Sequence, residues 1–69
     1  MRRYVIRAVN SLLHNDDCYS LEQINEAIGL VTNAELGKIE VASSSEKEVT
    51  ISNILTKWIL KKMEHEEAA

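Results

Sequence analysis

A histidine and a cysteine near the end of the first apolar segment are the first residues that could do chemistry. His14 and Cys18 could be two ligands of a metal ion. A zinc site needs about four nitrogen or sulfur ligands, and the only other histidine is His65, close to the C-terminus. As a nucleophile, Cys18 would need a base within reach and a stabilised thiolate, but its neighbours are the acids Asp16 and Asp17. We therefore expect neither a metal site nor a catalytic cysteine.

The same acidic stretch is superficially similar to part of a calcium-binding loop. An EF-hand loop ending at Glu26 would begin at Asn15 and place Asp17 at its third position. Its fifth position would be Tyr19, and Ser20 would stand at the sixth, where the loop requires glycine. An acidic turn between two helices is the better interpretation.

Phosphate-binding loops and enclosed acid–base sites are not indicated either. The two glycines, Gly29 and Gly37, are isolated, whereas a phosphate-binding loop needs several close together. Carboxylates are plentiful, but a domain of 69 residues offers little cleft in which to desolvate them. We predict that the protein is not an enzyme and uses no cofactor.

The composition is that of one small globular domain over residues 1–69. Apolar residues make up 45% and charged residues 28% of the chain, as is ordinary for a globular domain. At this length a core is marginal, and the single cysteine excludes an internal disulfide, so a partner subunit or regular helix packing is the expected support. No apolar run approaches the roughly 20 residues that span a bilayer, and no signal peptide is recognisable. We expect a cytoplasmic protein with no membrane contact.

Charge is unevenly distributed along the chain. The formal net charge is −3. Residues 1–13 carry arginines and no acid, residues 14–48 are strongly acidic, and the last third is balanced. A protein that wraps nucleic acid is expected to be basic overall, so this balance disfavours nucleic acid as the partner.

Helices should dominate, because the chain has no proline and only two glycines. Apolar periodicity predicts a first helix over residues 3–14 and a second over residues 21–28, with Gly29 as a left-handed residue at the end of the second. In a capping box, a Ser or Thr side chain accepts a hydrogen bond from the backbone N–H three residues later. The Glu or Gln at that later position accepts one from the backbone N–H of the Ser or Thr, and the pattern marks helix starts. These patterns begin at Ser20, Thr32 and Ser45.

The second half of the chain allows two interpretations. Leu36 and Ile39 suit a short third helix over residues 33–41, but residues 38–51 also alternate as the strands of a hairpin would. A long last helix should begin at residue 46 or 49 and end near residue 66. Its expected inward stripe consists of Ile51, Ile54, Leu55, Trp58 and Ile59.

Residues 20–39 resemble a helix-turn-helix. The residues that carry the resemblance are Ile24, Ile28, Gly29 and Leu30, with Thr32 as the cap of a second helix. The chain departs from the family pattern at Asn25, where a small residue is expected, and its turn would carry an extra residue. We predict an all-α domain of three or four helices with a helix-turn-helix-like centre and a long C-terminal helix. The alternative is a winged helix with a hairpin at residues 38–51.

A DNA-binding function would use lysines and arginines at phosphates and a recognition helix at the bases. Here that helix would offer Asn33 and Lys38 beside the acids Glu35 and Glu40. The full set for this alternative is Arg3, Arg7, Asn33, Lys38, Lys57 and Lys61. Because two carboxylates would face the phosphates, a small DNA-binding regulator is the second hypothesis.

The last helix is apolar on more than the face that a core requires. If Ile51 marks the core direction, Val49 and Leu60 fall roughly opposite, and Ile59 and Met63 lie on the flank between. Single exposed apolar residues are normal, but these four could together pack on another chain. The leading hypothesis is a non-enzymatic protein–protein interaction module, a small regulator, inhibitor or adaptor, that binds a protein partner or forms a homodimer through this helix.

Overall fold

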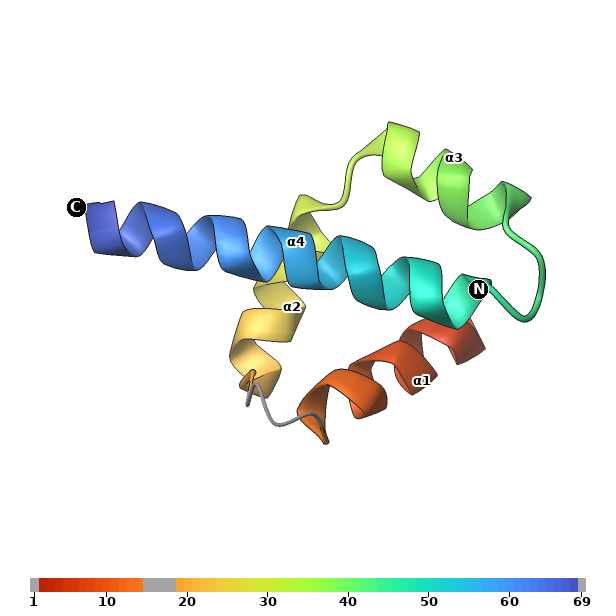
Figure 1. Ribbon diagram of the computed structural model, residues 1–69, viewed down its shortest axis with the longest axis horizontal. Coiled ribbons are helices and arrows are strands. Elements are labelled where there is room, and N and C mark those ends of the chain that lie inside the picture. The colour runs from red at the N-terminus through yellow and green to blue at the C-terminus, as the bar shows by residue number, and fades with distance from the viewer. Residues whose placement is uncertain (1, 15–18, 69) are drawn as a thin grey trace.

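The protein is a four-helix domain in a computed structural model that describes residues 2–14 and 19–68, the last three of them by backbone alone. In chain order the helices are α1 (Arg2–Leu13), α2 (Leu21–Leu30), α3 (Asn33–Val41) and α4 (Lys47–Ala68) (Figure 1). No strand occurs among the described residues. The all-α prediction is confirmed.

The alternative hairpin at residues 38–51 is wrong. The cap at Thr32 starts a helix that continues to Val41, and residues from Lys47 onward form the first turns of α4. The alternation of apolar and polar residues over this stretch is so short that it fits both the two-residue period of a strand and the 3.6-residue period of a helix. The helical cap and the burial of Ile39 against the core select the helix.

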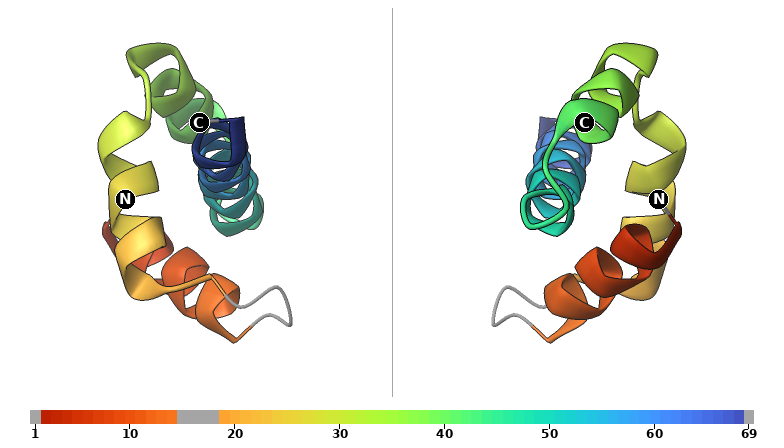
Figure 2. Two further views of the ribbon diagram at one scale, coloured as in Figure 1. Left: turned by 90° about the vertical axis from the view of Figure 1, so that its left-hand side faces the viewer. Right: turned by 90° about the vertical axis from the view of Figure 1, so that its right-hand side faces the viewer.

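Helix α4 is the central element of the fold. It packs against each of the other three helices, whereas the described backbone of α3 approaches neither α1 nor α2. Figure 2 shows α1, α2 and α3 as an arc that follows one side of α4, and Figure 1 shows the C-terminal half of α4 extending past α2. Among the described helices, α4 is therefore the one whose backbone lies against α3.

The core lies between α4 and this arc. Ile24 of α2 and Leu55 of α4 are the largest fully buried side chains, each worth about 1.5–3 kcal/mol relative to an exposed one. The buried apolar side chains are Ala8, Leu12, Tyr19, Ile24, Ala27, Ile39, Ile51, Leu55 and Ile59. On the expected stripe of α4, Ile54 and Trp58 are half-buried against this core.

Two of the three expected capping boxes form. The hydroxyl of Ser20 accepts the backbone N–H of Gln23 at 3.1 Å, and the side chain of Gln23 accepts the backbone N–H of Ser20 at 2.9 Å. Thr32 and Glu35 form the equivalent box at the start of α3. At Ser45 the prediction is wrong, because α4 begins at Lys47 and the Ser45 hydroxyl lies 3.2 Å from that of Ser43.

The end of α2 also differs from expectation. The helix continues through Gly29 to Leu30, and Val31 is its C-cap. Val31 leaves the helix with φ −59° and ψ 127°, and because this φ is negative no left-handed glycine is needed. The connection of α2 to α3 is thus Val31 and Thr32 alone. This helix order is compatible with a helix-turn-helix-like centre, which stays a prediction.

Across the ranges that the structure describes, no helix has both the length and the apolar character needed to cross a membrane.

Candidate interaction surface

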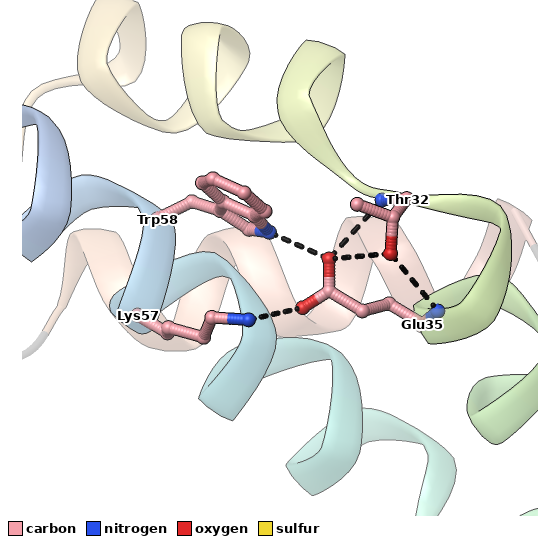
Figure 3. Close-up of polar contacts among 4 residues, drawn as sticks. All are labelled: Thr32, Glu35, Lys57 and Trp58. Atoms are coloured by element: carbon pink, nitrogen blue, oxygen red, sulfur yellow. Dashed lines mark hydrogen bonds and ion pairs between the residues drawn. The ribbon is translucent and has the colours of Figure 1, made fainter.

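The carboxylate of Glu35 is the polar centre of the contact between α3 and α4. Its side chain is 9% exposed and receives hydrogen bonds from two residues of α4 (Figure 3). Lys57 Nζ donates to Oε2 at 2.9 Å, and Trp58 Nε1 donates to Oε1 at 2.7 Å. From the start of α3, both the backbone N–H and the hydroxyl of Thr32 donate to Oε1, each at 3.1 Å. We call these four residues the Glu35 latch.

The latch keeps Glu35 ionised. Burial of the carboxyl group would raise its pKa, but the hydrogen bonds from the Thr32 backbone, Lys57, Trp58 and the Thr32 hydroxyl favour the charged form and lower the pKa from 4.5 to about 2. A carboxylate with all its partners in place and a pKa this low is unsuited to exchanging protons near neutral pH. Its role is to fix α3 on α4.

Sequence reasoning missed this role of Glu35. The capping box was recognised, but Glu35 was expected to face outward beside Glu40. In the structure Glu40 is exposed and Glu35 is buried. The local pattern shows the bond to Thr32, whereas the partners Lys57 and Trp58 lie 22 and 23 residues further along the chain.

An apolar groove of about 90 Å³ lies where α1 and α3 fail to meet. All of its lining side chains are aliphatic, and all four helices or their ends contribute to it. They are Val5, Ile28, Val31, Leu36, Ile39, Ile51 and Leu55. We call this feature the α1–α3 groove.

The α1–α3 groove has a buried floor and an exposed rim. Ile39, Ile51 and Leu55 are 2–3% exposed and form the floor, while Ile28 is 39% and Leu36 is 41% exposed. A space of this size suits one bulky aliphatic side chain, since apolar cavities of about 150 Å³ hold a small hydrocarbon. The groove therefore offers apolar surface to the solvent at a point where a second molecule could cover it.

The caps at the start of α3 help to form this groove. Val31 precedes the Thr32 cap, and Leu36 is the fourth residue of α3. Apolar residues at these two positions often pack together across a helix start, and here both line the groove. The side chain of Leu36 remains 41% exposed, so it borders the groove without being buried in it.

The four residues of α4 assigned to a partner do not form one surface. Ile59 is 2% exposed and belongs to the core, so its assignment to the surface is wrong. Met63 is half-buried and packs against that core, and together with Ile59 it lines a small pocket against α2. Val49 and Leu60 are exposed, at 59% and 51%. The helical wheel left this flank open because it contains no information about where α2 packs.

The basic residues of the DNA-binding alternative are also dispersed. Arg3 and Arg7 are exposed on α1, and Asn33 and Lys38 are exposed on α3. Lys57 is occupied by its ion pair with Glu35.

Two lysines of that alternative are engaged with Trp58. The ammonium groups of Lys57 and Lys61 lie 4.8 and 5.3 Å from the centre of the Trp58 ring. Cations held over an aromatic face at this distance interact favourably with it. These side chains are therefore committed, in whole or in part, to contacts within the protein.

The candidate metal and calcium ligands fall mainly in residues 15–18, outside the described residues. Within the described ranges, no three His, Cys, Asp or Glu side chains come together as a metal would require. His14 is exposed just beyond α1, and Tyr19 is buried in the core.

Comparison of the chain with protein-family models, with curated proteins and with solved structures finds no match.

Proposed function

We propose that this protein is a non-enzymatic interaction module, a small regulator or adaptor, that binds a protein partner in the α1–α3 groove. The observation that carries the proposal is a groove lined only by aliphatic side chains and left open between two helices. Sites that receive an apolar anchor from a partner helix have this composition and shape.

The groove is a better candidate than the outer face of α4. Val49 and Leu60 are eleven positions apart, which is about 16 Å along a helix. The exposed, polar Asn53 lies between them. In the groove, by contrast, Ile28 and Leu36 border one continuous apolar surface.

Binding in the groove would also support the least anchored helix. The nine-residue α3 packs on α4 and has no backbone contact with α1. Elements with few neighbours open at low free-energy cost and are often those that bind ligands. An apolar side chain seated between Val5 of α1 and Ile39 of α3 would fill this gap. The partner would thereby gain affinity from surfaces that the free protein leaves in water.

Site-specific photo-crosslinking in cells of the source organism tests this function. A photo-reactive benzoylphenylalanine would replace Leu36 at the rim of the groove, or Asn53 on the outer face of α4 as the control. We expect a discrete protein adduct from position 36 and none of equal yield from position 53. The mass of the adduct also shows whether the partner is a second copy of this chain. No adduct at position 36, or equal adducts at both positions, would contradict the proposal.

A further inference from the structure

A second hollow lies beside Trp58, between α4 and Leu30 at the end of α2. It has a volume of about 360 Å³ and is lined by Leu30, Trp58, Lys61, Lys62 and His65. Its size is within the range of about 300–1,000 Å³ that is usual for ligand sites. Its surface is mainly apolar, yet three of its five residues carry basic groups.

The Glu35 latch fixes the floor of this hollow. The indole N–H of Trp58 is already bonded to Glu35, so the ring is held in one orientation and offers its apolar surface rather than a donor. Leu30, which is 43% exposed, lies beside it. A preorganised aromatic ring loses little entropy when another group packs against it.

The basic groups at the rim are not equally available. Lys62 is paired with Glu26. Lys61 is exposed and, within the described part of the chain, has the Trp58 ring as its contact and no carboxylate. The exposed His65 follows one helical turn later. The hollow therefore combines an apolar floor with a cation, Lys61, that has no ion pair with an acid whose side chain the structure describes.

From this juxtaposition we infer that the Trp58 hollow binds an acidic peptide segment that carries a bulky apolar side chain. The apolar side chain would cover Leu30 and Trp58, and a neighbouring carboxylate would pair with Lys61. A single uncompensated lysine is too little for a nucleic-acid backbone, whose binding depends on several phosphate contacts. This site is separate from the α1–α3 groove and does not depend on the function proposed for it.

The fluorescence of Trp58, the chain's single tryptophan, reports directly on the hollow. The probe is an acetylated and amidated peptide of sequence Asp-Glu-Leu-Leu-Asp-Glu, and the control peptide replaces its acids by Asn and Gln. We expect a saturable change in emission with the acidic peptide and at least threefold weaker binding of the neutral one. Lys61→Gln should weaken the acidic peptide about three- to fivefold, in the range of a surface ion pair.

Matched variants identify the site. Lys38→Gln removes an exposed lysine from α3 and should leave peptide binding unchanged, as should Leu36→Asn at the rim of the groove. No saturable change in emission, equal binding of both peptides, or equal effects of Lys61→Gln and Lys38→Gln would overturn the inference. Far-UV circular dichroism of each variant verifies that all four helices are retained.

Discussion

The indole N–H of Trp58 donates a hydrogen bond of 2.7 Å to Oε1 of Glu35, and this bond ties the long helix α4 to the short helix α3. Lys57, one residue earlier, binds the second carboxylate oxygen at 2.9 Å. Two consecutive residues of α4 thus donate hydrogen bonds to the two carboxylate oxygens of one buried acid. The position of α3, and with it the width of the α1–α3 groove, depends on these two bonds.

Replacing the Glu35 carboxylate by an amide should weaken its hydrogen bonds to α4 and lower the stability of the protein. Glu35→Gln keeps the size of the side chain but places a neutral amide beside Lys57, so the charge-assisted bonds are lost. We expect the free energy of unfolding to fall by about 2 kcal/mol at neutral pH, because hydrogen bonds to charged groups contribute about 1.5–3 kcal/mol. Urea unfolding followed by circular dichroism measures this change. Glu40→Gln, an exposed substitution in the same helix, should cost less than about 0.5 kcal/mol; equal effects would mean that the latch contributes nothing.

Acid should remove the same contribution from the wild-type protein. The pKa of Glu35 is lowered from 4.5 to about 2 by folding, so its stabilisation is fully present above about pH 4.5 and is lost as the pH falls toward 2. Linkage gives a loss of about 2 kcal/mol between pH 5.5 and pH 2.5 from this group. Urea unfolding at the two pH values gives the loss in free energy of unfolding for each protein. The loss should be about 2 kcal/mol larger in the wild type than in Glu35→Gln, which lacks the titrating carboxyl group. If both proteins lose the same stability, Glu35 does not have a depressed pKa in the folded state.

The local part of this structure was predictable, and the tertiary part was not. The boxes at Ser20 and Thr32 were recognised because both partners of each box lie within one turn of sequence. The burial of Ile59 was expected in the core stripe, yet the same residue was also assigned to a surface. Only the position of α2 resolves that conflict, and no periodicity within α4 contains it.

Tertiary contacts also explain why the end of α2 and the burial of Glu35 were not predicted from the sequence. Gly29 was expected to end α2 because glycine is common there, but Val31 ends it with a negative φ of −59°. The partners of Glu35 come from a helix that begins after a separate loop, so a pattern of a few residues could not identify them. The α1–α3 groove could not be predicted from a local pattern either, because its lining comes from all four helices or their ends.

Two substitutions on α4 separate core from surface. Met63→Glu should lower the free energy of unfolding by about 1–3 kcal/mol, because it brings a carboxylate against the core. Leu60→Glu should change stability by less than about 0.5 kcal/mol, as exposed substitutions usually do. Urea unfolding gives both values, and light scattering gives the solution mass of each protein. A dimeric wild type that becomes monomeric on Leu60→Glu with unchanged stability would instead restore self-association through α4.

Affinity for polyanions should be low. Lys57 and Lys62 are paired with acids, and the net charge of the chain is −3. We expect the protein to pass through a heparin column at low ionic strength, because the remaining basic residues are dispersed over α1, α3 and α4 and the overall charge repels a polyanion. Retention that falls steeply with salt and is reduced by Arg3→Gln with Arg7→Gln would favour the nucleic-acid alternative.

The most direct test of the α1–α3 groove is the affinity of the crosslinked partner for matched variants of this protein. Leu36→Asn alters the rim of the groove, whereas Val49→Asn makes the same kind of change at an exposed apolar residue of α4, and both variants should unfold near the wild-type urea concentration. We predict that Leu36→Asn weakens binding tenfold or more, equal to about 1.4 kcal/mol, and that Val49→Asn leaves it unchanged. Strong loss with Val49→Asn and none with Leu36→Asn would place the binding surface on α4 and contradict the account.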